Sequence, residues 1–181
     1  MSKDELIVQL EQVFRQYGYD GATLARLSEA TGLSKASLYH YFPKGKEEMA
    51  AVVLNQRQWF EEHILSPLRS DGLASERICT MLKNVDKLYN SGEKPCLLAV
   101  LLLGESRDLF ESQIKFSLNL WIDTLAQVLV EEGLDVELAR QRAEDAIIQI
   151  QGALVLSRGL GNTASFERVI KHLPEFLLRV I

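Results

Sequence analysis

Cysteine, proline and long apolar runs are all scarce in this sequence. Its 181 residues include two cysteines, Cys79 and Cys96, and four prolines. Two cysteines cannot form a disulfide framework, and no cysteine–histidine cluster has the spacing of metal ligands. No apolar run approaches the roughly 20 residues that span a bilayer, and the start MSKDELIV lacks the layout of a signal peptide. We therefore expect a cytoplasmic protein that uses no metal, no cofactor and no membrane.

Catalytic motifs are missing as well. The chain contains no phosphate-binding loop and no nucleophile elbow, and its three histidines, His40, His63 and His172, are scattered. Alternation of apolar and polar residues, which marks strands, is almost absent, whereas apolar residues recur with a helical period of 3.6 over long stretches. The sequence predicts an all-α protein that is not an enzyme.

The chain does contain enough apolar material for a sizeable core. Hydrophobic residues make up 47% and charged residues 25% of the sequence, as in ordinary globular proteins. A length of 181 residues exceeds the roughly 100 to 150 residues of a typical single domain. We expect a small domain over residues 1–48 and a larger one over residues 49–181.

Three capped helices are predicted in the first of these domains. Ser2 and Glu5 form a capping box ahead of an apolar face, and Gly18 ends this helix; the face is formed by Leu6, Ile7, Leu10, Val13, Phe14 and Tyr17. Thr23 caps a second helix, which stops at Gly32. Ser34 caps a third, whose inward residues are Leu38 and either Tyr41 or Phe42.

The segment LARLSEATGLSKASLYHYFP, residues 24–43, has the spacing of a helix-turn-helix. Gly32 suits the reversal of the chain, Ser28 is small where the two helices cross, and leucines fall where their inner faces meet. An αα-hairpin that binds nothing has the same core pattern. The outward residues must therefore decide between the two interpretations.

The outward face of the third helix carries small, basic and aromatic residues, namely Lys35, Ala36, Ser37, Tyr39 and His40. Small residues and one long donor in the first turn suit a helix that reaches base edges in the major groove, while Tyr39 and His40 can donate to phosphates. Lys44 and Lys46 follow at the start of the next helix, whose amide groups also favour a phosphate. This pattern predicts a DNA-binding surface; the alternative is a solvated face with Tyr39 half-buried.

Net charge by itself does not support DNA binding. The formal net charge is −5, and residues 1–50 hold six Lys or Arg against seven Asp or Glu, whereas nucleic-acid-binding domains are usually basic. Between residues 22 and 46 the sign reverses, with four cations against Glu29: Arg26, Lys35, Lys44 and Lys46. So modest a patch requires specific contacts, and two copies, to hold a DNA site.

The segment ARLSEATGLSKASLYHYFPKGKEEM, residues 25–49, resembles the DNA-binding domain of the TetR/AcrR family of bacterial transcriptional repressors. That family combines a capped helix and a glycine turn with the pattern S-K-x-[ST]-L-Y-x-[YH]-F-P, followed by K-E-E-[LM]. The extra residue in PKGK, with KPCLLAVLLLGE at 94–105 and FERVIKHLPEFLL at 166–178, resembles the LmrA/YxaF-like subset. The resemblance implies a three-helix DNA-binding domain and a larger helical domain that pairs two subunits and accepts a small ligand.

Carried over by position, the resemblance also implies residue roles. Thr23 would cap the second helix and meet a phosphate; Lys35, Ala36 and Ser37 would face bases; and Tyr39, His40 and Lys46 would hold the DNA backbone. Ser34 and Lys44 complete the predicted DNA-binding set. The chain departs from the family at Ser28, where alanine is usual, and at Ala36, where glycine is common. Ser28 should be harmless, while Ala36 could alter which base the helix admits.

Further helices are predicted over residues 46–65, 75–91, 97–109, 111–132, 135–159 and 163–180. The first of them would run unbroken from Lys46 into the larger domain, and Ser66-Pro67 would close it. Candidates to line a cavity for a small hydrophobic ligand are Trp59, His63, Met81, Cys96, Phe110, Phe116 and Trp121. Each of these, taken alone, is more often a core residue.

The segment AIIQIQGALVLSRGLG, residues 146–161, is apolar nearly all round, so a helix here needs cover on two sides. Together with residues 163–180 it predicts a two-fold, four-helix homodimer interface. The predicted interface residues are Ile148, Gly152, Ala153, Val155, Leu156, Phe166, Val169, Ile170, Leu173 and Leu177. The alternative is a central helix buried inside a monomer.

The sequence thus favours a repressor that binds a palindromic operator in double-stranded DNA as a homodimer and is released by a small hydrophobic ligand. One alternative is a DNA-binding regulator of the same fold that senses redox state, with Cys96 as the thiol, or a partner protein. Another is a helical carrier or enzyme without DNA binding.

Overall fold

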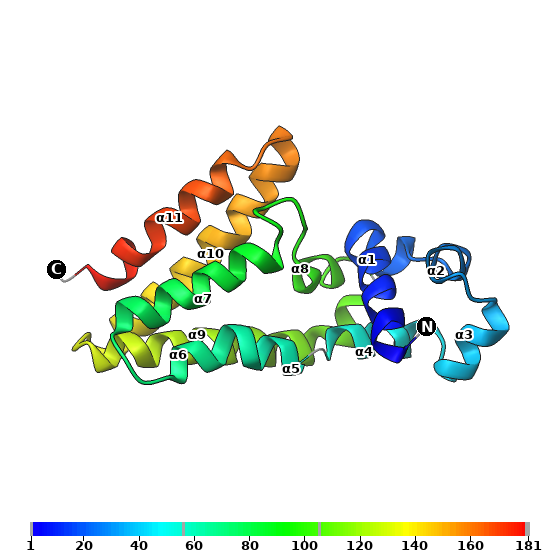
Figure 1. Cartoon of the computed structure of the whole chain (residues 1–181), viewed down its shortest axis with the longest axis horizontal. Helices are drawn as coiled ribbons and strands as arrows, with labels where there is room; N and C mark the ends of the chain where they lie inside the picture. Colours follow the sequence, from blue (N-terminus) through cyan, green and yellow to red (C-terminus); the bar gives the residue numbers. More distant parts are fainter. Residues whose placement is uncertain (1, 56, 105, 180–181) are drawn as a thin grey trace. The chain divides into compact units, whose positions relative to one another are not determined.

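A computed structural model describes residues 2–55, 57–104 and 106–179, and within these ranges the regular structure is entirely helical (Figure 1). The predicted all-α fold is confirmed. The chain forms two compact units. The head unit comprises Met1–Arg57 and Cys96–Ile114, and the body unit comprises Gln58–Pro95 and Lys115–Ile181. The head unit thus includes a second segment, 96–114, beyond the predicted DNA-binding domain, whose boundary between residues 48 and 49 stays a prediction.

The head unit is built on α1 (Lys3–Gly21), α2 (Leu24–Thr31), α3 (Lys35–Tyr41) and α4 (Lys46–Leu54). The predicted capping box is present: the Glu5 amide donates to Ser2 Oγ at 3.1 Å, and the Ser2 amide donates to Glu5 Oε2 at 2.7 Å. Fully buried apolar side chains from all four helices form its core, among them Leu10, Phe14, Leu27, Leu38 and Met49.

Two aromatic residues of the predicted inner faces point outward instead. Tyr17 is 41% exposed and Tyr41 is 43% exposed, whereas Phe42 is buried at 1%. The inward position on α3 is therefore filled by Phe42, and the prediction for Tyr17 was wrong. The Tyr17 ring instead lies under the Arg26 guanidinium, and the Tyr41 ring contacts the rings of His40 and Phe42.

The helix predicted over residues 46–65 is interrupted, and the prediction of one continuous helix was wrong. α4 ends at Leu54, and Asn55 follows as a turn. The chain then forms α5 (Arg57–Phe60), a π-helical turn η1 (Glu61–Leu65) and α6 (Ser66–Arg69). Residues 66–67 do not close the helix, since α6 carries on through them to Arg69.

Pro67 accounts for the π-helical turn. A proline inside a helix has no amide hydrogen and its ring collides with the carbonyl four residues earlier, which here belongs to His63. In η1 the Ser66 amide bonds to Glu61 five residues back, which widens the turn. The His63 carbonyl instead accepts a hydrogen bond from Asn84 Nδ2 on α7 at 2.8 Å.

The body unit contains α7 (Ala74–Leu88), most of α9 (Ser106–Glu131), α10 (Val136–Leu160) and α11 (Ala164–Leu178). α10 and α11 lie side by side as an antiparallel pair (Figure 1). Asp135 caps α10, and Gly161 ends it in the left-handed conformation with φ of 67°. The bounds of α10 and α11 agree with the predicted helices to within two residues, whereas α7 stops at Leu88, three residues early, and α9 begins at Ser106, five residues before its predicted start.

The predicted break near residue 110 was wrong. The short α8 (Leu97–Leu101) ends before Gly104, and α9 then runs on from Ser106. Gly104 has a φ of 68°, which interrupts a helix, and no residue with that conformation occurs near position 110.

Among the described residues, no helix combines the length and the apolar character that a membrane span requires.

Candidate nucleic-acid interface

The helix-turn-helix geometry rests on local hydrogen bonds at each helix end. Thr23 Oγ1 accepts from the Arg26 amide at 3.3 Å, and Ser34 Oγ accepts from the Ser37 amide at 3.1 Å, so both predicted caps are present. Gly32 ends α2 in the left-handed conformation with φ of 66°. These contacts set the start of α3 relative to the end of α2.

Ser28 does more in this turn than fill a small space. Its hydroxyl donates to the Leu33 carbonyl, across the turn between α2 and α3. Buried Thr31 adds a second link, because its hydroxyl oxygen accepts from the Leu33 amide at 3.4 Å while the hydroxyl donates to the Leu27 carbonyl within α2 at 2.7 Å. The departure from the family's usual alanine at position 28 therefore supplies an extra bridge within the helix-turn-helix.

The outward face of α3 is open to solvent. Ser34, Lys35, Ala36, Tyr39 and His40 are exposed, and Ser37 is half-buried. The Ser37 hydroxyl lies 2.9 Å from the Ser34 hydroxyl, so these two form a pair at the helix start. Lys35 and Ala36 beside them present one long donor and one small surface, which is the combination that a base-reading helix requires.

Tyr39 covers the loop that leads to α4. Gly45, the residue before α4, has φ of 71°, and a Cβ placed on it would lie 3.1 Å from Tyr39 Cε1. The positive φ favours glycine at this position, and an added Cβ would crowd the aromatic ring above it. Lys44 is exposed, and its backbone amide donates to Glu48 Oε2 at 2.8 Å. The Lys44 amide, which lies near the start of α4, is therefore already hydrogen-bonded to the Glu48 carboxylate.

Lys46, the first residue of α4, turns its ammonium group toward α1. Nζ donates to the Tyr19 carbonyl at 3.0 Å and lies 4.1 Å from the centroid of the Tyr19 ring. The side chain is half-buried. Burial raises the pKa of Tyr19, with smaller contributions from the carboxylates of Glu47 and Asp20, so the ring stays neutral under the cation.

Arg26 was counted in the predicted basic patch but was not among the residues predicted to contact DNA. Its guanidinium carbon lies 4.3 Å from the centroid of the Tyr17 ring, and Nη1 donates to the Gly21 carbonyl at 2.7 Å. Arg26 and Tyr17 are both exposed, and Arg26 lies one turn after Thr23. The spacing of nine residues between Tyr17 and Arg26, across a helix end, carries no periodic signal that could have paired them.

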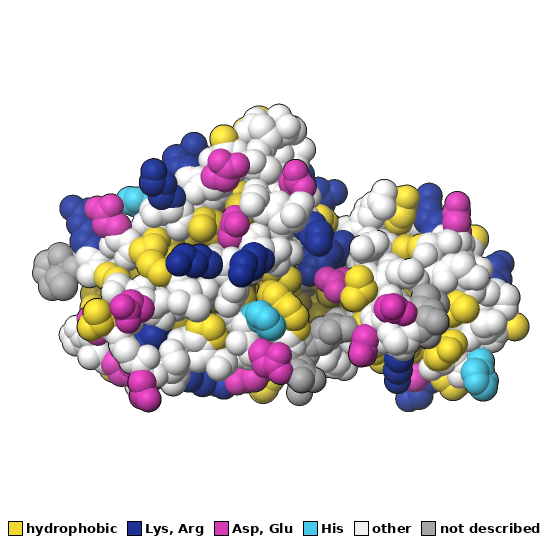
Figure 2. Space-filling view, in the orientation of Figure 1, with side chains coloured by type: hydrophobic (Ala, Val, Ile, Leu, Met, Phe, Trp, Pro, Cys, Tyr) yellow, Lys and Arg dark blue, Asp and Glu magenta, His cyan; other side chains and the backbone are white. Residues whose placement is uncertain are grey.

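The distribution of charged side chains agrees with the small excess of cations that the sequence places around the helix-turn-helix. On the face shown in Figure 2, Lys and Arg side chains over α1–α3 are interspersed with Asp and Glu and do not form one continuous basic area. Such a surface relies on a few well-placed contacts more than on a general attraction to phosphates.

The seven predicted ligand-pocket residues are divided between the two units. Cys96 and Phe110 belong to the head unit, where both are buried. The remaining five belong to the body unit: Met81 and Trp121 are buried, Trp59 and His63 are half-buried, and Phe116 is 53% exposed. Whether they line one site therefore stays a prediction.

An aromatic cluster lies beside the π-helical turn in the body unit. The rings of Trp59 and His63 stack with centroids 4.5 Å apart, and His63 Nδ1 lies 3.0 Å from the Trp59 carbonyl. Phe60 meets Trp121 edge to face, with centroids 5.7 Å apart. Trp121 is 1% exposed, and its indole Nε1 has no hydrogen-bond partner among the described residues. A buried donor of this kind is costly to leave unpaired.

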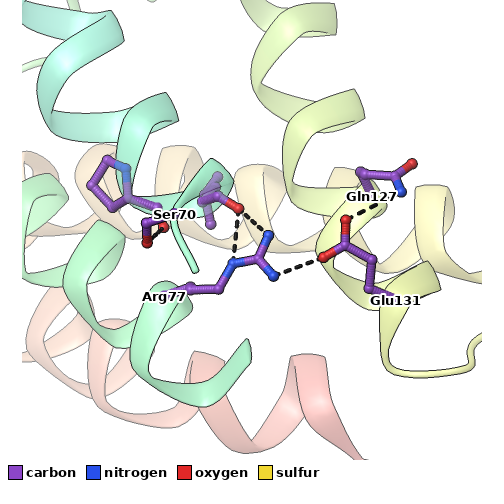
Figure 3. A network of polar contacts seen from close by, with 6 residues as sticks. Ser70, Arg77, Gln127 and Glu131 are labelled. Carbon is purple, nitrogen blue, oxygen red and sulfur yellow. Dashed lines mark hydrogen bonds and ion pairs between the residues drawn. The ribbon is translucent and has the colours of Figure 1, made fainter. Parts of the chain in front are cut away.

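A polar cleft of about 350 Å³ lies elsewhere in the body unit, between α6, α7 and α9, and includes none of the seven predicted residues. Arg77 is one of its lining residues, and Figure 3 shows the polar contacts that Arg77 makes. Arg77 Nε donates to the Leu68 carbonyl at 2.9 Å, and Nη1 donates to Glu131 Oε2 at 2.7 Å (Figure 3). Hydrogen bonds from Arg77 and Gln127 hold the pKa of Glu131 below its ordinary value. Within the cleft, Arg77 and Gln127 both donate to Glu131, so we interpret this network as a structural link between α7 and α9.

The predicted dimer-interface residues fall into two sets. Ile148, Val155 and Leu156 are exposed at 60%, 71% and 51%, Gly152 is exposed, and Val169 and Ile170 are half-buried. The others are buried inside the protomer, at 3% or less: Ala153, Phe166, Leu173 and Leu177. These four cannot offer side chains to a partner, because α10 and α11 already use them to pack on their own unit.

Among the described residues, no group of three or more His, Cys, Asp or Glu side chains is placed to hold a metal ion. Cys79 is half-buried and Cys96 is buried.

Comparison with known families gives matches over most of the chain. Residues 6–53 match the family described as bacterial regulatory proteins, tetR family. Residues 74–172 match the family described as transcriptional regulator LmrA/YxaF-like, C-terminal domain. The HTH-type transcriptional regulator LmrA of Bacillus subtilis (strain 168) is 22% identical over 183 residues, which cover 98% of this chain and 97% of that protein.

Solved structures share the fold. A TetR transcriptional regulator from Legionella pneumophila superposes with a TM-score of 0.82 at 24% identity, covering 97% of this chain and 96% of its own. The regulator FadR from Bacillus subtilis, in complex with stearoyl-CoA, gives a TM-score of 0.74 at 20% identity, covering 99% of this chain and 100% of its own.

Proposed function

Since the chain belongs to the TetR family of bacterial transcriptional regulators, in its LmrA/YxaF-like branch, we propose that it is a repressor released from DNA by a small hydrophobic ligand. It is a DNA-binding regulator and not an enzyme. We propose further that it acts as a homodimer on a palindromic operator. Its place of action would be the cytoplasm, where a bacterial operator lies.

The observation that carries the proposal is the exposed face of α3. Lys35 and Ala36 stand in its first turn without a competing intrachain contact among the described residues, so they are free to meet base edges. We assign base reading to Lys35, Ala36 and Ser37. Contacts to the DNA backbone are assigned to the remaining predicted set on this surface: Thr23, Ser34, Tyr39, His40 and Lys44.

Dimer formation is supported by the apolar stripe on α10. Ile148, Val155, Leu156 and Leu160 are each more than half exposed on one helix of the protomer, although apolar side chains of this size favour burial. Gly152 lies among them, and a Cβ on it would meet no atom within 4 Å. A second copy laid on this face would cover the stripe and could approach the helix closely at the glycine.

The ligand we propose is an apolar molecule with a hydrogen-bond acceptor. Trp59, Phe60 and Trp121 provide aromatic surface beside η1, and the unpaired Nε1 of Trp121 provides a donor. A π-helical turn is uncommon and often occurs at functional sites. Since the similar FadR was solved with stearoyl-CoA, a long-chain acyl compound is a rational first probe.

Ligand and operator would compete through one conformational equilibrium. Allosteric coupling of about 1–3 kcal/mol weakens DNA binding by roughly 5 to 150-fold. By thermodynamic linkage the operator must weaken ligand binding by the same factor. A ligand that quenches tryptophan fluorescence would therefore bind less tightly when operator is present.

The test is a selection of duplexes from a random-sequence library, followed by gel shifts with the selected duplex. We expect a palindromic site, a complex containing two protomers, and release by a member of an acyl-compound panel. Trp121→Phe should lower the affinity for that ligand more than it lowers the affinity for DNA. Absence of any sequence preference in the selection would refute the proposed function.

A further inference from the structure

The end of α1 and the first turn of α2 bring Tyr17 and Arg26 together at the surface of the head unit. The Arg26 guanidinium lies over the Tyr17 ring, with its carbon 4.3 Å from the ring centroid, and its Nη1 donates to the Gly21 carbonyl at 2.7 Å. A Cβ on Gly21 would lie 3.2 Å from Tyr17 Cβ and 4.0 Å from Arg26 Nη1, so this glycine leaves room for the pair. The ring and the carbonyl together hold the exposed guanidinium in one place.

Arg26 is a cation without a carboxylate partner. Arg15 and Arg107 in the same unit each form an ion pair with a glutamate four residues away. Across residues 2–55, 57–104 and 106–179, Arg26 forms no such pair, and its side chain has one hydrogen-bond acceptor, the Gly21 carbonyl. A guanidinium carries five N–H donors. Most of the donors of Arg26 are therefore available to an acceptor on another molecule.

The stability of α2 does not account for this cation. Arg26 lies in the first turn of α2, and that turn contains no acidic residue. A cation in the first turn is opposed by the helix dipole, whose positive end is the N-terminus. The Gly21 carbonyl at the end of α1 does favour the cation, so a substitution of Arg26 loses this contact within the chain as well as any contact to a partner.

Arg26 lies on the side of α2 that carries Thr23. Residues three positions apart are neighbours on a helix surface, and the Thr23 hydroxyl accepts from the Arg26 amide at 3.3 Å. Both residues are exposed. In a helix-turn-helix the first helix crosses the DNA backbone while the second helix enters the major groove. Since α2 is the first helix of this pair, Arg26 lies where the motif meets phosphates.

From these observations we infer that Arg26, held on the Tyr17 ring, binds a phosphate of the operator backbone beside the Thr23 contact. The inference rests on the proposed DNA-binding function and adds to it a residue outside the predicted DNA-binding set. The planar guanidinium can donate two parallel N–H bonds to two oxygens of one phosphate. Because the side chain is already held, it loses little rotamer freedom when it binds.

This contact accounts for the fourth cation of the basic patch over residues 22–46. The other three, Lys35, Lys44 and Lys46, already belong to the predicted DNA-binding set. In a patch of so few charges, a cation whose position is fixed before binding contributes more than a freely moving one. The exposure of Tyr17 then has a functional reason, since its ring supports the phosphate-binding group.

Salt dependence distinguishes a phosphate contact from a contact that only maintains the fold. Each neutralised phosphate contributes about −0.9 to the slope of log K against log salt concentration. Arg26→Met should weaken binding to the selected duplex about five-fold and make the slope less steep by about 0.9 per protomer. Arg107→Met is the matched control, because it removes an exposed arginine of the same unit and should change neither quantity. A loss of affinity at an unchanged slope, or no loss for Arg26→Met, would overturn the inference.

Single methylphosphonate substitutions in the selected duplex locate the contact, since each replaces one charged phosphate by a neutral group. One such position in each half-site should lower the affinity of the wild type about five-fold and leave that of Arg26→Met unchanged, because the variant has already lost the contact. Arg26→Lys should retain the salt slope but lose part of the affinity, because an ammonium group cannot bond bidentately. Identical methylphosphonate profiles for the wild type and Arg26→Met would contradict the assigned contact.

A double-mutant cycle tests the support that Tyr17 gives. Tyr17→Phe keeps the ring and should bind as the wild type does, whereas Tyr17→Leu should lower the affinity roughly two- to five-fold. In the Arg26→Met background Tyr17→Leu should have no further effect; equal losses in both backgrounds would show that the ring does not act through Arg26. All variants are compared at a temperature where circular dichroism shows a folded protein. A wild type that selects no duplex would overturn the proposed function itself, whereas one that selects a duplex and binds it no better than Arg26→Met would overturn this inference alone.

Discussion

Replacement of Gly152 by arginine should separate folding of the protomer from dimer formation. Gly152 is exposed on α10, and an added Cβ would meet no atom within 4 Å. Its neighbours on this face, Ile148, Val155 and Leu156, are exposed at 60%, 71% and 51%. A single protomer therefore has room for a long side chain at this position, whereas a second protomer laid on the stripe would collide with it.

The substitution should stabilise the folded protomer slightly and destabilise the dimer strongly. Within a helix, arginine is about 1 kcal/mol more favourable than glycine, so the protomer should become slightly more stable. In a two-fold interface the change occurs twice, because the same patch of both subunits takes part. An unpaired charge removed from water costs about 3 kcal/mol or more, so two arginines cost roughly 6 kcal/mol. At about 1.4 kcal/mol per factor of ten, the dimer dissociation constant should rise by roughly 10⁴-fold.

Analytical ultracentrifugation across a concentration series measures this change, with circular dichroism as the check on folding. Gly152→Arg should sediment as a monomer, keep its helical spectrum and lose binding to the full operator. Gly152→Ala is the control, because it gains a similar helix preference of about 1 kcal/mol yet stays small enough for a partner to approach. The reasoning fails if the arginine variant sediments as the wild type does, or if it binds the operator with wild-type affinity while monomeric.

Four other changes have defined outcomes. Lys35→Ala should cost about 1–3 kcal/mol on the selected duplex and relax the preference at one base pair of each half-site, as a repeated selection would reveal. Ser28→Ala should lower the free energy of unfolding by about 1 kcal/mol in urea titrations, because the bridge across the helix-turn-helix is lost. Asn84→Ala should cost about 1 kcal/mol by unpairing a carbonyl, and Pro67→Ala should relieve that cost by restoring an amide donor; equal costs in both backgrounds would contradict this account. Because the folded-state pKa of Glu131 lies below 4.5, its contribution to stability is present above that pH and lost as the pH falls through the folded value, so the melting temperatures of Glu131→Gln and wild type should converge in acid.

Local chemistry made the helix-turn-helix predictable. The caps at Ser2, Thr23 and Ser34 and the left-handed Gly32 are all present, because capping and glycine turns depend on residues only two or three positions apart. The outward residues of α3 followed from helical periodicity alone. The same holds for α10 and α11, whose ends are set by Asp135 and by Gly161.

Residue-level assignments failed where a side chain could face either of two environments. Tyr17 was expected on the inner face of its helix, yet it is exposed and its ring contacts Arg26. On α3 the sequence left the choice between Tyr41 and Phe42 open, and the packing buries Phe42. On α10 and α11 the apolar pattern predicted helices that pack on two sides. It did not distinguish the residues that face the protomer's own core from those that face a partner. Phe166, Leu173 and Leu177 are buried because other helices of the protomer pack against that side of α11. The periodicity of the sequence does not indicate which helices these are.

Sequence alone therefore determined the helical class, the capped helix-turn-helix and the family, since these depend on short-range hydrogen bonds and on patterns that recur at fixed spacing. Tertiary structure alone decided the long-range pairings. The ammonium of Lys46 reaches Tyr19, which lies 27 residues earlier, and Asn84 reaches the carbonyl of His63, which lies 21 residues earlier. Such contacts arise only after the chain has folded back on itself, when a charged or polar group must find a partner among whatever the packing brings near it.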